Sequence, residues 1–183
     1  MLRFLPERPG DADEVEQLLD LAFAPGRTAL SAYQLREGVA AIPALCRIAR
    51  DDYDALVGAV RCWPVRIGEA GHPALLLGPI AVHPTRQGEG IGATLMAETL
   101  AEARALGWRR VILVGDEPYY ARFGFTRAAA AALDFPSPVN RARLLAKALV
   151  PGAFDGVSGM VARWKGPLPA EMLREAPTPG KEN

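Results

Sequence analysis

The stretch Arg86-Gln87-Gly88-Glu89-Gly90-Ile91-Gly92 decides how the chain is interpreted, because it joins an apolar run to a helical pattern. The run at residues 74–82 predicts a buried strand, and residues 93–106 carry apolar side chains at helical spacing. Three glycines between them leave successive backbone N–H groups free to turn toward one point. The helix that follows adds unpaired amides and the positive end of its dipole. The stretch therefore predicts a cradle for an anion such as a phosphate group.

The chain has 183 residues, which fit one domain of ordinary size with a tail. We assign residues 1–165 to the domain, and residues 166–183, with four prolines and little periodicity, to a loosely attached tail. Basic and acidic side chains balance at 21 each, so the overall charge favours neither nucleic acid nor an anionic membrane as a partner. No run approaches the length of a membrane span. We expect a cytoplasmic protein without nucleic-acid or membrane partners.

The two cysteines, Cys46 and Cys62, lie in apolar, strand-like surroundings and lack CxxC spacing. A disulfide framework or a zinc site is therefore not expected, and we predict no metal. Both side chains are predicted to lie in the core.

The pattern around the glycine stretch predicts alternating helices and strands. Upstream we expect a strand at residues 2–5 and then an amphipathic helix, which Pro25-Gly26 ends and which carries Val15, Leu18, Leu19, Ala22 and Phe23. A short helix at residues 28–38 should follow and bury Leu30, Tyr33 and Leu35. Residues 43–50 and 55–67 should form an antiparallel hairpin. Downstream we expect a cap at Gly107, a strand at 110–114, a helical turn at 116–122, a strand opened by Phe123-Gly124-Phe125, and strands at 143–150 and 159–164.

Two ordered motifs resemble one known family. A strand ending in Ile80-Ala81-Val82-His83-Pro84, followed by Arg86-Gln87-x-x-Gly90-x-Gly92 opening a helix, resembles the acetyl-coenzyme A motif of the GNAT N-acetyltransferase superfamily. Tyr119-Tyr120-Ala121-Arg122-Phe123-Gly124-Phe125 is similar to the tyrosine and Gly-Phe signature of the same superfamily, one helix and one strand downstream. Together they are far more specific than a lone glycine-rich loop, and the resemblance covers residues 75–125.

Two well-known phosphate-binding loops fit the glycine stretch less well. A Walker loop would end in Gly-Lys-Ser or Gly-Lys-Thr, which is absent. A Rossmann fingerprint would belong to an early βαβ unit, whereas three strand-like stretches precede this one, although Asp116 does follow the next strand. A plain strand-to-helix turn stays open as an alternative, but three clustered glycines are more than such a turn requires.

The resemblance implies a mixed α/β GNAT fold, with a mostly antiparallel central sheet flanked by helices and one parallel strand pair that splays apart. The pantetheine arm of acetyl-CoA would lie in the resulting slot and pair with the backbone like an added strand. Gly78-Pro79 fits the bulge expected there, or else a simple strand irregularity. The residues that the resemblance assigns to acetyl-CoA are Ile80, Ala81, Val82, Arg86, Gln87, Gly88, Glu89, Gly90, Ile91, Gly92, Ala93, Tyr120 and Phe123.

The resemblance also implies an enzyme that moves the acetyl group of acetyl-CoA to a primary amine by direct attack in a ternary complex. The amides of residues 87–92 would hold the pyrophosphate, and Arg86 would neutralise phosphate charge unless it is a solvated surface residue. Tyr120, four residues before Gly124, is the candidate acid, and a backbone N–H near Val82 is the oxyanion donor. His83 is the candidate base, beside Asp116 and Glu117, which fit equally as helix caps.

The acceptor is not readable, because this family sets it through the early helices and late strands. We expect a small-molecule amine, with a protein amine as the second class and tRNA disfavoured by the zero net charge. The acidic residues 11, 13, 14 and 16 would attract an amine or belong to a solvated helix N-terminus. A non-catalytic acetyl-CoA sensor is the alternative from another class, although intact Gly90, Gly92 and Tyr120 count against it. Homodimerisation through the late strands is a further prediction.

Overall fold

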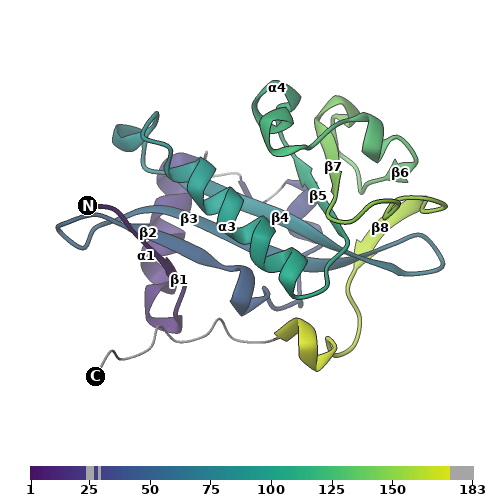
Figure 1. Ribbon diagram of the computed structural model, residues 1–183, viewed down its shortest axis with the longest axis horizontal. Helices are drawn as coiled ribbons and strands as arrows, with labels where there is room; N and C mark the ends of the chain where they lie inside the picture. Colours follow the sequence, from purple (N-terminus) through teal and green to yellow (C-terminus); the bar gives the residue numbers. More distant parts are fainter. Residues whose placement is uncertain (24–26, 29, 174–183) are drawn as a thin grey trace.

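Helices cover both faces of an open, twisted sheet in the computed structural model, which describes residues 1–23, 27–28 and 30–173 (Figure 1). The strands are β1 (Arg3–Pro6), β2 (Arg47–Arg50), β3 (Leu56–Ile67), β4 (His72–Val82), β5 (Arg110–Val114), β6 (Leu133–Asp134), β7 (Leu144–Ala148) and β8 (Gly159–Arg163). The α-helices are α1 (Ala12–Ala22), α2 (Ser31–Gln34), α3 (Ile91–Ala105) and α4 (Glu117–Tyr120). The predicted strand at residues 110–114 therefore has the bounds of β5.

The central path of the sheet runs β1-β2-β3-β4-β5-β7. Neighbours on this path are antiparallel except β4 and β5, which are parallel. Strand β8 pairs antiparallel with the end of β3 and parallel with the two-residue β6. The mixed, mostly antiparallel sheet with one parallel pair on its central path confirms the predicted fold class.

Strand β4 carries the irregularity that the sequence predicts. Val60 of β3 lies opposite Ile80, whereas Cys62 lies opposite Leu77, so β4 holds one extra residue around Gly78-Pro79. Such a bulge suits proline, which has no N–H to give to the ladder. On its other edge β4 pairs with β5 only at Leu75 and Leu76. The two parallel strands therefore part just before the bulge and leave the end of β4 with an open edge.

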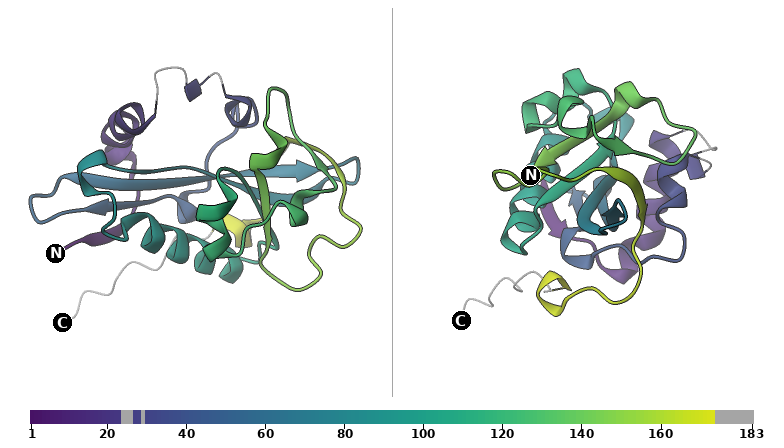
Figure 2. Two further views of the ribbon diagram at one scale, coloured as in Figure 1. Left: turned by 90° about the horizontal axis from the view of Figure 1, so that it is seen from above. Right: turned by 90° about the vertical axis from the view of Figure 1, so that its right-hand side faces the viewer.

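The helices lie in two layers, with α1 and α2 on one face of the sheet and α3 on the other (Figure 2). Helix α1 buries Val15, Leu18 and Leu19, whose spacing puts them on one helical stripe. Helix α3 packs Leu95 and Met96 into a larger cluster on the opposite face. The core therefore lies in two layers, one on each face of the sheet.

The second predicted helix is shorter than expected. The pattern predicted residues 28–38, but among the described residues of that range only α2 (Ser31–Gln34) is α-helical, because Leu30 has an extended backbone and the chain turns at Gly38. Leu35 is buried as expected, whereas Leu30 is 57% exposed. The predicted break at Pro25-Gly26 lies outside the described residues.

Two predicted strands also begin differently. Residues Pro43–Leu45 form a 3-10 turn, and β2 starts only at Arg47, because proline favours the first position of such a turn. The strand predicted after Phe123-Gly124-Phe125 is reduced to a single bridge between Thr126 and Ala146. Phe125 is fully buried at this point, so core packing rather than sheet pairing fixes the chain.

The first part of the predicted tail contacts the domain. Leu168 precedes the 3-10 helix Ala170–Leu173 and Met172 lies in it; both pack against the hydrophobic cluster that contains Leu95 and Met96 of α3. Trp164 meets Trp108 edge-on with ring centroids 6.5 Å apart. The domain boundary at residue 165 stays a prediction, and residues 174–183 lie outside the described part. Within that part, no helix combines the length and apolarity needed to span a membrane.

Candidate active site

The open end of β4 presents backbone groups to the space between β4 and β5. The N–H of His83 donates to the carbonyl oxygen of Val57 at 2.8 Å, so this pair is hydrogen-bonded across β3 and β4. Bonded and non-bonded pairs alternate in an antiparallel ladder, and Val82 lies opposite Gly58 in the next position. The N–H and C=O groups of Ile80 and Val82 therefore point away from β3. Since β5 has already diverged, they open into the slot.

The glycine stretch forms a groove at the start of α3. Gly88 and Gly90 adopt φ values of +84° and +78°, a conformation that favours glycine, and Gly90 directly precedes the helix. The first-turn amides of α3 have no partner within the helix. A cavity of about 470 Å³, which we call the cradle groove, lies against these amides. The predicted residues that line it are Ile80, Val82, Arg86, Gln87, Gly88, Gly90, Ile91, Gly92, Ala93 and Tyr120.

Three predicted residues do not line the cradle groove. Ala81 points to the opposite face and joins the α1 cluster, as the alternation of the strand requires. The carboxylate of Glu89 is paired with Arg86, with 2.9 Å between Oε1 and Nε. Phe123 packs edge-on against Tyr119 with centroids 5.8 Å apart. None of these three side chains therefore faces the groove.

Arg86, predicted to neutralise phosphate, already has two acidic partners. Besides Glu89, it contacts Asp51 with 3.1 Å between Nη1 and Oδ2. A second arginine in the groove, Arg122, makes no ion pair with any described residue. Its guanidinium lies 4.1 Å from the centroid of the Tyr119 ring, and its Nε donates to the Tyr119 carbonyl at 3.0 Å. Arg122 belongs to the second motif, but its local sequence predicted no role for it.

Tyr120 lies where two cavities meet, since it lines both the cradle groove and a second cavity on the α2 side of β4. Its ring packs edge-on against Tyr119 and Phe125, with centroids 4.9 and 6.3 Å away. It also lies so close to Gly115 that a Cβ at that position would overlap the ring. Burial, with smaller effects from Tyr119 and Asp116, raises the pKa of Tyr120 to about 12. The phenol therefore keeps its proton at neutral pH.

The three candidate bases lie in different places. The Nδ1 of His83 accepts a hydrogen bond from the Thr85 N–H at 3.2 Å, which caps the turn Pro84–Arg86, and His83 lines neither cavity. The Glu117 carboxylate accepts from the Arg127 N–H and lines a separate pocket. Asp116 lines the second cavity with Tyr120, and its Oδ1 lies 3.6 Å from Arg143 Nε. Neither acidic side chain caps α4, contrary to the capping alternative.

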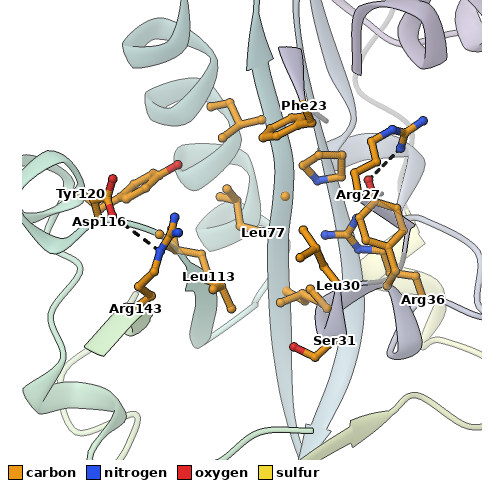
Figure 3. Close-up of a pocket in the computed structure, with 18 of the residues that line it drawn as sticks. Phe23, Arg27, Leu30, Ser31, Arg36, Leu77, Leu113, Asp116, Tyr120 and Arg143 are labelled. Carbon is orange, nitrogen blue, oxygen red and sulfur yellow. Dashed lines mark hydrogen bonds and ion pairs between the residues drawn. The ribbon is translucent and has the colours of Figure 1, made fainter. Parts of the chain in front are cut away.

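The second cavity, of about 430 Å³, lies on the face of the sheet that α1 and α2 cover, and we call it the α2 cavity (Figure 3). It is lined by α2 and its flanking residues, β4 around Gly78, the end of β5, α4 and Arg143. Its wall mixes apolar side chains such as Leu77 and Leu113 with charged groups. No local motif predicted this cavity, because its lining residues come from segments far apart in the sequence.

The acidic face of α1 is engaged by arginines. Glu16 accepts from Arg61 and from Arg27, while Arg50 bonds both Asp11 and Glu14. Three of the four predicted carboxylates, those of Asp11, Glu14 and Glu16, therefore form ion pairs with arginines, whereas Asp13 is exposed, as the alternative of a solvated helix N-terminus expects.

The cysteines behave as core residues. Cys46 and Cys62 are both buried and free, and burial raises the pKa of the Cys46 thiol to about 11. Across residues 1–23, 27–28 and 30–173, no three His, Cys, Asp or Glu side chains are grouped to hold a metal ion.

Comparison with known proteins identifies the family. The model of the family described as acetyltransferase (GNAT) domain matches residues 43–127. The uncharacterised N-acetyltransferase YhbS of Escherichia coli K12 is 30% identical over 155 residues, which are 85% of this chain and 92% of YhbS.

Two solved structures share the fold at comparable identity. The Escherichia coli YhbS structure in complex with CoA superposes with a TM-score of 0.76 at 28% identity, covering 90% of this chain and 89% of YhbS. A GNAT family acetyltransferase from Brucella melitensis in complex with acetyl-CoA gives a TM-score of 0.67 at 32% identity, covering 90% and 96%. With its split parallel pair, its glycine groove and these relatives, the chain belongs to the GNAT family of N-acetyltransferases.

Proposed function

We propose that this chain transfers the acetyl group of acetyl-CoA to a primary amine by direct attack in a ternary complex. The observation that carries the proposal is the open edge of β4, where the backbone groups of Ile80 and Val82 face the slot next to the cradle groove. The related structures that hold CoA and acetyl-CoA support this donor.

The residues around the slot fit acetyl-CoA. The free N–H and C=O groups of Ile80 and Val82 would pair with the amides of the pantetheine arm, as in the addition of a strand. The first-turn amides of α3 would take the pyrophosphate, aided by the charge of Arg122 and by Arg86. A Cβ on Gly92 would lie 3.3 Å from Tyr119 Oη and 3.4 Å from Val82 Cγ2, so a side chain at this position would crowd two residues of the groove.

Acetyl-CoA supplies a thioester whose carbonyl carbon bonds to the amine nitrogen while the C–S bond breaks and the thiolate takes up a proton. The Val82 N–H would donate to the carbonyl oxygen as it gains negative charge. Tyr120, which is protonated at neutral pH, would deliver the proton to sulfur. Asp116, the candidate base that lines the same cavity, would attract the protonated amine and accept its proton directly or through water.

The α2 cavity favours a small acceptor. Its volume of about 430 Å³ falls in the range of small-molecule sites, and Tyr120 connects it to the cradle groove. A small-molecule amine is therefore the first acceptor class, and a protein amine that inserts one side chain is the second.

The test is calorimetric titration with acetyl-CoA, followed in the same sample by thiol release against a panel of amines. Binding with amine-dependent release is the expected result. Binding without release from any small or peptide amine would favour an acetyl-CoA sensor. Failure to bind acetyl-CoA would overturn the proposal altogether.

A further inference from the structure

Arg36 is a charged side chain of the α2 cavity that the proposed reaction does not use. Its guanidinium carbon lies 4.3 Å from the centroid of the Tyr33 ring and 4.8 Å from that of Trp63. It also lies over the bulge of β4, where a Cβ on Gly78 would be 3.7 Å from Nη2. Figure 3 shows Arg36 on one side of β4, with Tyr120 and Asp116 on the other.

Two donors of this guanidinium are buried without acceptors. Arg36 Nε and Nη1 have no hydrogen-bond partner among the described residues. Aromatic faces attract the positive charge, but they do not replace acceptors in the plane of the guanidinium. Buried charged donors normally have such acceptors, so this pair of orphaned N–H groups requires an explanation.

The charge balance of the α2 cavity points the same way. Arg27 is opposed by Glu16 and Asp20, with 3.0 Å between its Nε and Asp20 Oδ1. Arg143 is opposed by Asp116. Arg36 pairs with no carboxylate in the described part of the chain, and the charged group that shares the Tyr33 ring with it is the guanidinium of Arg27. The cavity therefore holds one uncompensated positive charge at the end away from Tyr120.

We propose that the acceptor is an amine that also carries a carboxylate, and that Arg36 binds this carboxylate in the α2 cavity. The planar guanidinium offers parallel N–H donors along two edges, Nε with Nη2 and Nη1 with Nη2, and a carboxylate matches either edge. Each of the two orphaned donors belongs to one of these edges. With the carboxylate at Arg36, the amine extends over Leu77 and Leu113 toward Asp116 and Tyr120. The acceptor class is thus an amino acid or a close analogue. This inference rests on the proposed function, since it names the acceptor of the same site.

The experiment compares three matched amines that differ in one group: β-alanine, 2-aminoethylphosphonate and propylamine. Thiol release is measured with the wild type, Arg36→Met, Arg36→Lys and, as a control, Arg104→Met on the exposed side of α3. We expect kcat/KM for β-alanine to exceed that for propylamine by roughly 10²-fold, and Arg36→Met to remove this preference. Arg36→Lys keeps the charge but not the paired donors, so it should retain part of the preference. Acetyl-CoA affinity should be unchanged in all variants.

Some outcomes overturn the inference and leave the transferase intact. Equal turnover of β-alanine and propylamine would do so, as would an unchanged preference in Arg36→Met. Preference for the phosphonate would overturn the carboxylate assignment. Thermal unfolding of each variant shows whether Arg36→Met is folded. If Arg36→Met does not fold, Arg36→Lys provides the test: a full preference for β-alanine over propylamine in Arg36→Lys would contradict recognition by paired donors.

A binding measurement separates this inference from the proposed function. Calorimetric titration of β-alanine and propylamine into the CoA complex reports the Arg36 contact without turnover. Tighter binding of β-alanine that is lost in Arg36→Met supports the inference even if no amine releases thiol, in which case only the proposed catalysis fails. Equal binding of the two amines overturns the inference.

Discussion

The two cavities that meet at Tyr120 are built in different ways. The cradle groove uses backbone amides of one nearly continuous stretch, from the end of β4 to the first turn of α3, joined by the short segment around Tyr120. The α2 cavity uses side chains from α2, β4, β5 and the residue before β7. Backbone recognition of an anion needs local conformation, which glycines supply. Selection of an acceptor needs side chains that only the folded chain brings together.

The largest effect is expected at the junction of the two cavities. Tyr120→Phe should lower kcat by about 10²-fold through loss of the proton donor, with acetyl-CoA affinity unchanged. Tyr119→Phe is the matched control, since the Tyr119 ring packs against the Tyr120 ring and Tyr119 also lines both cavities. Stopped-time thiol release gives kcat and calorimetry gives affinity. Equal losses in the two variants would remove Tyr120 from its role as acid.

The pH profile examines the same junction. Because the raised pKa of about 12 keeps Tyr120 protonated, wild-type kcat should rise as the amine loses its proton and then stay level to about pH 10. A free tyrosine would begin to lose its proton near that pH. A fall in kcat between about pH 8 and about pH 10 that is absent in Tyr120→Phe would contradict the raised pKa of Tyr120.

The next effect isolates the cradle groove. In Gly90→Val, a β-branched residue must adopt φ near +78° to keep the binding conformation, at a cost of about 1–2 kcal/mol, so acetyl-CoA affinity should weaken roughly 5- to 30-fold. Gly107→Val is the control, because Gly107 has φ +91° at the other end of α3 and open space around it, like Gly90. Both variants should unfold at lower temperature, but only Gly90→Val should lose affinity. Unchanged affinity in Gly90→Val would end the cradle assignment.

A smaller effect separates the two arginines of the groove. Arg122→Gln should weaken acetyl-CoA binding about threefold to fivefold at low salt and less at high salt, as expected for an exposed charge. Arg86→Gln should change affinity less, because Arg86 is engaged by Asp51 and Glu89. Calorimetry at two salt concentrations compares them. The reverse order would restore Arg86 as the main phosphate partner.

The smallest effect is expected at His83, outside both cavities. His83→Ala should leave kcat/KM within about twofold and reduce stability by about 1 kcal/mol, because the cap on the turn Pro84–Arg86 is lost. His83→Asn, which keeps an acceptor, should restore stability. A large loss of kcat in both variants would make His83 the base in place of Asp116.

Most of the fold was predictable because its signals are local. The strand at residues 110–114, the end of α3 near Gly107 and the bulge at Gly78-Pro79 follow from apolar runs, a capping glycine and a missing N–H. The errors occurred where contacts between distant segments decide. Leu30 is exposed although it follows the helical pattern, and Phe125 is held by the core instead of the sheet.

The family and the cradle groove could be inferred from the chain alone, because consecutive residues carry both the glycine conformations and the amides that bind an anion. Packing between distant segments was needed to show which candidate base reaches the slot and which arginine is left without partners. Asp116 lies beside Tyr120 through the helical turn that joins them, and both line the α2 cavity at the end of β5. His83 lines neither cavity, and its Nδ1 caps the turn Pro84–Arg86. Arg36 meets Gly78 only after α2 has packed over β4, so its orphaned charge has no signature along the chain.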